Sequence, residues 1–254
     1  MKLTQSLAAL VLGALHVAAA PTVYLCGDST MATKGGNTDG WGSYIGTYLT
    51  TPAVNRAIGG RSARSYWNEG RFKAVADLVK SGDIVVIEFG HNDGGSPESN
   101  DNGRSDCPGT GTQTCISDKT GEKVYTFVFY VTQAAKLMTA KGATVILSSQ
   151  TPNNQWETGT FGPAPSRFVG YQKTAVAAIG SSSVTFVDHF QAVTNMYRKL
   201  GSAAVNALYP NDHTHTSPNG AKLSAQAFAQ AIYQKLNGTT SLQSYIKTPI
   251  TTVY

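Results

Sequence analysis

The sequence lacks the short motifs that mark several large classes of enzyme. It contains no HExxH zinc-protease motif, no Walker A phosphate-binding loop and no paired CxxC motif. Zinc, nucleotide and redox functions therefore have no support, and we expect neither a metal nor a cofactor. The GxSxG motif of the α/β-hydrolases is also missing at Ser29, where the run reads GDSTM.

Long hydrophobic runs are missing too, except at the N-terminus. There the chain has a lysine at position 2, an apolar stretch from Leu7 to Val17 and small residues before Pro21. This pattern predicts a secretory signal peptide over residues 1–20. No later run approaches the roughly 20 apolar residues that a membrane-spanning helix needs. We therefore predict a secreted, extracellular protein with no membrane or nucleic-acid partner.

Cysteine is scarce, with three residues in the whole chain. Cys107 and Cys115 flank a loop rich in glycine, threonine and proline, and we expect them to form a disulfide, because exported proteins retain such bonds. Cys26 ends an apolar run and is predicted to be a buried, inert thiol. The single N-x-S/T sequon makes Asn237 a candidate glycosylation site.

Short apolar runs alternate with helical patterns along residues 21–254. Because unbroken apolar strands separated by helices are typical of buried parallel sheets, we predict an α/β fold, a three-layer α/β/α sandwich with a central parallel sheet. No linker, repeat or shift in composition divides this single domain, which we expect to be a monomer. The expected strands cover residues 22–26, 53–58, 83–89, 143–149 and 184–188. The expected helices cover residues 69–80, 126–141, 166–179 and 217–236, and residues 92–123 are expected to be irregular.

Polar residues follow the predicted strands at the edge where open parallel sheets bind ligands. Ser29 follows the first strand, Gly60 the second and Asn92 the third, and Asp212 and His215 precede the last helix. Each piece alone is a common turn sequence, but together, in this order, they predict an active site.

The chemistry of a serine nucleophile explains three of these residues. A serine hydroxyl needs a neighbouring base, and the base needs a third group to fix its tautomer. Ser29, His215 and Asp212 fit these three roles, because a D-x-x-H spacing folds the carboxylate back onto the imidazole. His213 is the alternative base, but Asp212 would then have to serve its immediate neighbour, which is geometrically poor.

Taken together, these blocks resemble the SGNH, or GDSL-type, hydrolase superfamily, and the resemblance implies that the sheet is flavodoxin-like. The resemblance implies an oxyanion hole built from the backbone N–H groups of Ser29 and Gly60 and the side chain of Asn92. Further runs resemble the fungal rhamnogalacturonan acetylesterase family, from about Val23 to Gly220: GRSARSY, EGRF, EFGHNDGG, DNGR, ILSSQTPNN, WETGTF and DHTHTSP. That family implies a secreted esterase with an α/β/α fold that removes acetyl groups from the galacturonic acid residues of pectin, without metal or cofactor.

Two features depart from this family's pattern. Cys26 stands where a small residue without a thiol is expected, and no cysteine follows Cys115 to form a second, C-terminal disulfide. We therefore expect the tail over residues 241–254 to be less constrained. Neither departure touches the predicted catalytic residues.

The substrate is less firmly indicated than the reaction. A formal charge of +5 on an exported chain favours a polyanionic partner such as pectin. We expect Arg61 or Arg64 to bind a substrate carboxylate, although both could instead pair with acidic side chains of the protein, and His91 to line the pocket. The alternatives are an esterase for acetylated xylan or small esters, and a carbohydrate-binding relative without catalysis. The presence of both Ser29 and the base His215 argues against a non-catalytic carbohydrate-binding protein, which has no need of them.

Overall fold

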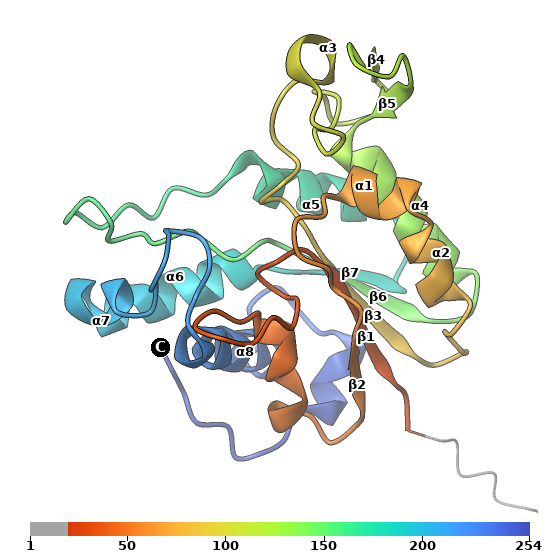
Figure 1. Cartoon of the computed structure of the whole chain (residues 1–254). Coiled ribbons are helices and arrows are strands. Elements are labelled where there is room, and N and C mark those ends of the chain that lie inside the picture. The colour runs from red at the N-terminus through yellow and green to blue at the C-terminus, as the bar shows by residue number, and fades with distance from the viewer. Residues whose placement is uncertain (1–19) are drawn as a thin grey trace, which may run out of the picture.

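Five parallel strands form the centre of the molecule (Figure 1). The computed structural model describes residues 20–254, so the predicted signal peptide lies, except for its last residue, outside the described residues. The strand order is β2-β1-β3-β6-β7, the order of flavodoxin-like sheets. The strands are β1 (Val23–Gly27), β2 (Ala53–Asn55), β3 (Ile84–Glu88), β6 (Thr144–Ser148) and β7 (Val184–Val187). All five lie within or next to the predicted strands.

Helices cover both faces of this sheet, which confirms the three-layer α/β/α sandwich (Figure 1). One face carries α1 (Ala63–Asn68), α2 (Arg71–Ala76), α4 (Phe127–Thr139) and α5 (Arg167–Ile179). The other carries α6 (His189–Leu200), α7 (Ser202–Asn206), α8 (Pro218–Tyr233) and the short 3-10 helices η1 (Trp41–Ser43), η2 (Ile45–Tyr48) and η3 (Ser241–Tyr245). No helix within residues 20–254 is long and apolar enough to cross a membrane.

The central strand β3 shows why the sheet needs apolar residues on both sides. Ile84 and Val86 pack against the layer that contains α6 and α8, and Val85 and Ile87 pack against the layer that contains α4. All four side chains are buried, because successive residues of a strand point to opposite faces. An uninterrupted apolar run is therefore what a strand between two helical layers requires.

The helical prediction was wrong in two places. The helix expected over residues 69–80 is the shorter α2, and the separate helix α1, which was not predicted, precedes it; Gly70, left-handed with φ of 69°, separates the two. The helix α6 was not predicted at all. Its N-terminus is capped by Asp188, whose side chain accepts a hydrogen bond from the backbone N–H of Gln191.

The segment expected to be irregular, residues 92–123, contains two small pieces of regular structure. They are the single turn α3 (Pro97–Asn100) and the strand β4 (Thr114–Ile116), which pairs antiparallel with β5 (Lys123–Tyr125) at the end of the segment. The disulfide between Cys107 and Cys115 is present, as predicted. Cys26 is the free, buried cysteine, and burial raises the pKa of its thiol to about 12, so the thiol is protonated near neutral pH.

The C-terminal tail is more constrained than expected. The backbone N–H of Thr50 donates to the carbonyl of Tyr245, and the side chain of Gln230 bonds both the N–H of Val253 and the carbonyl of Tyr254. Hydrogen bonds to α8 and to the residues after η2 thus hold the C-terminal tail in place, although the tail has no second disulfide.

The Cys107–Cys115 bond closes a loop with a sequence separation of 8 residues. Replacing both cysteines by serine should lower the free energy of unfolding by about 2 to 3 kcal/mol, because the unfolded chain regains the entropy of an open loop. Urea denaturation with and without a reductant measures this. The native protein should lose stability in the reductant and the double variant should not; equal behaviour of the two proteins would contradict a stabilising bond.

Candidate active site

Ser29 lies in the turn that follows β1. The turn is fixed by Asp28, whose Oδ1 accepts hydrogen bonds from the backbone N–H and the hydroxyl of Thr30 at 2.9 and 2.8 Å. Gly27 precedes it for steric reasons, since a Cβ there would lie 2.8 Å from the carbonyl oxygen of Glu88 on the neighbouring strand. The Gly-Asp-Ser run therefore holds the Ser29 hydroxyl at the carboxyl edge of the sheet.

His215 links Ser29 to Asp212. Its Nε2 lies 2.8 Å from the Ser29 Oγ, and its Nδ1 lies 2.8 Å from Asp212 Oδ2. The other oxygen of Asp212 accepts the backbone N–H groups of Thr214 and His215, both at 2.7 Å. Partial burial opposes ionisation of Asp212, but the hydrogen bonds from His215 and Thr214 outweigh it and lower its pKa to about 2. The carboxylate is therefore charged near neutral pH and holds the imidazole proton on Nδ1.

Three hydrogen-bond donors lie beside this chain of contacts. The backbone N–H groups of Ser29 and Gly60 donate to no other protein atom within residues 20–254, and Gly60 has a φ of 75° that favours glycine. The amide of Asn92 is held at both ends: its Nδ2 donates to the carbonyl of Arg61 at 3.1 Å, and its Oδ1 accepts from Arg104 at 3.3 Å. One N–H of the Asn92 amide is left for a ligand.

An open groove of about 420 Å³ contains these groups. Its lining residues are Ser29, Lys34, Gly59, Gly60, His91, Asn92, Arg104, Thr214 and His215. The sequence analysis missed Lys34 and Arg104. The only available signal was that Arg104 belongs to the DNGR run, whereas Lys34 stands in no motif. Within the described chain, no group of three or more His, Cys, Asp or Glu residues is arranged to hold a metal ion.

Comparison with known proteins agrees with this geometry. Residues 25–223 match the model of the GDSL-like lipase/acylhydrolase family. The chain belongs to this family. It is 52% identical to the rhamnogalacturonan acetylesterase of Emericella nidulans over 230 residues, which cover 90% of this chain and 91% of that protein. A probable rhamnogalacturonan acetylesterase of Bacillus subtilis is 27% identical and is matched over 97% of its length. This GDSL-like hydrolase is therefore an esterase, a carboxylic ester hydrolase.

Solved structures of GDSL-like hydrolases and esterases share its fold. A Bacillus subtilis protein, YxiM, superposes with a TM-score of 0.65 at 23% identity, and the match covers 87% of this chain but 58% of that one. A mutant of an acetylxylan esterase from Geobacillus stearothermophilus superposes with a TM-score of 0.55 at 16% identity, over 83% of this chain and 93% of that one. Both confirm the α/β architecture.

The other histidines of this GDSL-like hydrolase occupy different positions. His91 lines the groove, with Nδ1 and Nε2 each 3.5 Å from the side chains of Gln150 and Thr151. His213 is exposed, and its Nδ1 lies 3.3 Å from a carboxylate oxygen of Glu157. The structure therefore brings His215, and not His213, to Ser29.

The two arginines expected to bind substrate are occupied by the protein itself. Arg64 has 1% of its side chain exposed and pairs with the carboxylates of Asp101 and Glu122, so the structure contradicts a role in the groove. The Arg64 guanidinium holds the pKa of Asp101 well below its usual range. Arg61 is half-exposed, but its Nε lies 3.1 Å from the Glu69 carboxylate, and neither arginine lines the groove.

Asn237, the candidate glycosylation site, lies in an exposed turn after α8. Its Oδ1 accepts a hydrogen bond from the backbone N–H of Asp188 at 2.7 Å. This contact ties the turn to the N-terminus of α6 and leaves the side-chain nitrogen without a hydrogen bond within residues 20–254. Glycosylation there stays a prediction.

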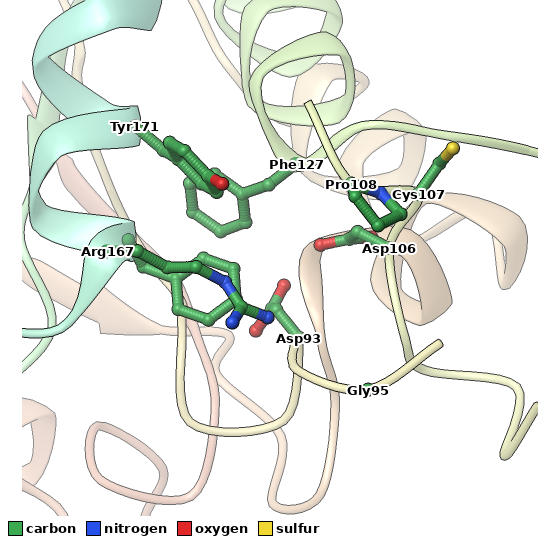
Figure 2. Close-up of a pocket in the computed structure, with 9 residues that line it drawn as sticks. Asp93, Gly95, Asp106, Cys107, Pro108, Phe127, Arg167 and Tyr171 are labelled. Atoms are coloured by element: carbon green, nitrogen blue, oxygen red, sulfur yellow. The ribbon is translucent and has the colours of Figure 1, made fainter. Parts of the chain in front are cut away.

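Behind Asn92, two buried carboxyl groups point toward each other in a small cavity of about 190 Å³ (Figure 2). Asp93 Oδ1 accepts the first N–H of α1, from Ala63, at 2.7 Å, but its Oδ2 and both oxygens of Asp106 have no donor in the described chain. Burial raises the pKa of Asp93 to about 7 and raises that of Asp106 well above its usual value. The charge of Asp28 adds to the shift of Asp93, and the charge of Asp93 adds to the shift of Asp106. The pair therefore holds a proton that the unfolded chain would release.

This proton makes stability depend on pH with a definite sign. The folded pair binds more protons than the unfolded chain between about pH 4 and 7, so the free energy of unfolding should fall as the pH rises, by about 1.4 kcal/mol per pH unit for each extra proton that the folded pair holds. In Asp106→Asn the amide can donate to an ionised Asp93, and this decline should flatten. Urea denaturation at pH 4.5 and 7 compares the two proteins; an identical pH slope in both would contradict a shared proton.

Proposed function

We propose that this chain is a secreted esterase that removes acetyl groups from rhamnogalacturonan by a Ser29–His215–Asp212 mechanism with an acetyl-enzyme intermediate. The observation that carries the proposal is the continuous line of hydrogen bonds from Asp212 through His215 to the Ser29 hydroxyl, at 2.8 Å for each side-chain contact, inside an open groove. Such an arrangement activates a hydroxyl that would otherwise be a poor nucleophile.

In the first half-reaction the Ser29 Oγ attacks the acetyl carbonyl carbon and gives its proton to Nε2 of His215. Asp212 stabilises the imidazolium that results. The carbonyl oxygen becomes an oxyanion, and the backbone N–H groups of Ser29 and Gly60 together with the Asn92 amide are the donors placed to bind it. The intermediate then expels the sugar oxygen, which takes the proton back from His215, and leaves acetyl-Ser29.

The second half-reaction uses the same residues with water as the nucleophile. His215 removes a proton from the water as it attacks the acetyl carbon of Ser29, and a second oxyanion forms at the same three donors. Collapse of this intermediate breaks the bond to the Ser29 Oγ, which regains its proton from His215. Acetate leaves, and the free enzyme is restored.

The substrate part of the proposal is supported by the close relative and by the groove. The Emericella nidulans protein at 52% identity is named a rhamnogalacturonan acetylesterase. The groove is open and lined by polar and cationic side chains, which suits a sugar chain better than a lipid acyl chain. The predicted signal peptide over residues 1–20 fits a substrate that lies outside the cell.

The catalytic part predicts large losses from single substitutions. Ser29→Ala and His215→Ala should each lower kcat by about 10⁴- to 10⁶-fold, because the three residues act as a unit. His213→Ala is the matched control and should cost far less. Rates of 4-nitrophenyl acetate hydrolysis, with circular dichroism to confirm folding, measure this, and comparable losses at positions 213 and 215 would refute the assigned base.

The substrate part predicts a ranking. Acetate release from acetylated rhamnogalacturonan should exceed that from acetylated xylan, and both should exceed hydrolysis of a long-chain lipid ester, because the lining of the groove includes two cationic side chains and no aliphatic or aromatic hydrophobic residue. Chromatographic measurement of acetate at equal ester concentration gives the order. Faster release from xylan would contradict rhamnogalacturonan as the substrate and favour acetylated xylan, and faster hydrolysis of the lipid ester would contradict any carbohydrate substrate.

A further inference from the structure

Two of the residues that line the groove are cationic and none is acidic. Lys34 comes from the loop after β1, and Arg104 from the loop after α3. Within residues 20–254, no carboxylate lies within 4.0 Å of the charged nitrogens of either side chain. The groove that holds Ser29 and His215 is therefore a site of uncompensated positive charge.

Other arginines near the site show the contrast. Arg61 pairs with Glu69, and Arg64 pairs with Asp101 and Glu122, so their charges are neutralised by the protein itself. A charge that meets no counter-ion in the protein remains available to a ligand. Arg61 and Arg64 therefore stabilise the protein's own structure, whereas Lys34 and Arg104 present their charges to the groove.

Arg104 is held so that part of its guanidinium stays free. Its backbone N–H and that of Ser105 both donate to Asn102 Oδ1, at 2.9 and 3.0 Å, which fixes the turn that carries it. One terminal nitrogen, Nη1, donates to Asn92 Oδ1 at 3.3 Å. No other side-chain bond of Arg104 is formed within the described chain, so Nε and Nη2 remain as a pair of donors of the kind that binds a carboxylate.

Lys34 supplies a second charge from a different loop. Its backbone N–H donates to Asp39 Oδ1 at 2.9 Å, which anchors the loop, while its side chain is exposed. An exposed ammonium on a flexible stem adds a long-range attraction without a fixed geometry, whereas the planar guanidinium adds direction. Together they suit an anionic group that lies beside the ester bond and not at the reacting carbon.

We propose that Lys34 and Arg104 form a subsite for the carboxylate of a uronic acid residue next to the acetyl group being removed. The inference rests on the proposed function, and it replaces the expected role of Arg61 and Arg64. The carboxylate accepts hydrogen bonds from Arg104 and is attracted by Lys34, so the sugar is oriented with its acetyl ester toward Ser29.

The test compares charged and neutral substrates in three variants: Lys34→Gln, Arg104→Gln and Lys141→Gln. Lys141 is the matched control, since it is exposed, belongs to no ion pair within residues 20–254 and precedes β6, at the edge of the sheet opposite to the groove. The substrates are acetylated rhamnogalacturonan oligosaccharides, the same oligosaccharides with their carboxyl groups methyl-esterified, and 4-nitrophenyl acetate.

We expect the ratio of kcat/KM for the charged substrate to that for its methyl ester to fall about fivefold in Lys34→Gln and about tenfold in Arg104→Gln. Arg104→Gln should also slow 4-nitrophenyl acetate, since Arg104 orients Asn92, and the ratio separates this effect from carboxylate binding. Added salt should lower the ratio in the native protein more than in the variants. Lys141→Gln should leave the ratio unchanged.

A second measurement does not depend on deacetylation of pectin. Digalacturonate should inhibit 4-nitrophenyl acetate hydrolysis competitively in the native protein and about fivefold to tenfold more weakly in Lys34→Gln and Arg104→Gln. Equal losses on charged and esterified substrates, with unchanged inhibition, would overturn the subsite. Failure of the native protein to release acetate from rhamnogalacturonan, while digalacturonate still inhibits, would instead overturn the proposed polysaccharide.

Discussion

The buried carboxylate of Glu88 is the interaction on which the edge of the sheet around the site depends. It lies at the end of the central strand β3 and accepts hydrogen bonds from Trp41 Nε1 at 2.9 Å and from the Ser148 hydroxyl at 2.6 Å, while His189 Nδ1 lies 2.9 Å away. A carboxylate removed from water is tolerated only when its oxygens are bonded in this way. These partners come from η1, β6 and α6, so a single side chain ties one helical layer to two strands. Gly27 is the residue of β1 in register with Glu88, and Ser29 follows it two residues later.

The strands could be predicted because the physical reason for their composition is local. A strand buried on both faces must be apolar along its whole length, and a run such as IVVIE in β3 satisfies this without reference to the rest of the chain. The helix α6 carried a readable signal too, since Ala192, Val193, Met196 and Tyr197 are spaced to bury one face behind the Asp188 cap. The pairing of β4 with β5 had no such signal, because each strand has three residues and the disulfide loop helps to bring them together.

In the candidate site, too, contacts between residues close in sequence could be predicted, whereas contacts between distant residues could not. The contact between Asp212 and His215 spans three residues, so spacing alone predicts it. The parallel topology brings Ser29, Gly60 and Asn92 to one edge of the sheet, because each of them follows a strand. It does not place Asp212 and His215, which follow the helix α7, and only the family resemblance brought them to Ser29. The partners of Arg64 could not be predicted, since Asp101 and Glu122 lie 37 and 58 residues away in a segment without periodicity. A basic residue in a motif therefore indicates a positive charge, but not whether that charge pairs with the protein itself or with a ligand.

Ser29 and His215 are separated by 186 residues, and this has a consequence for biosynthesis. A ribosome makes the serine turn early, and the strands β1 to β7 can pair before the segment with Asp212 and His215 has left the exit tunnel. A nascent chain that stops short of that segment would hold a correctly shaped serine loop without its base. In the proposed mechanism, hydrolytic competence thus arises only when nearly the whole polypeptide has been translated, and a truncated translation product would lack the base that activates its serine.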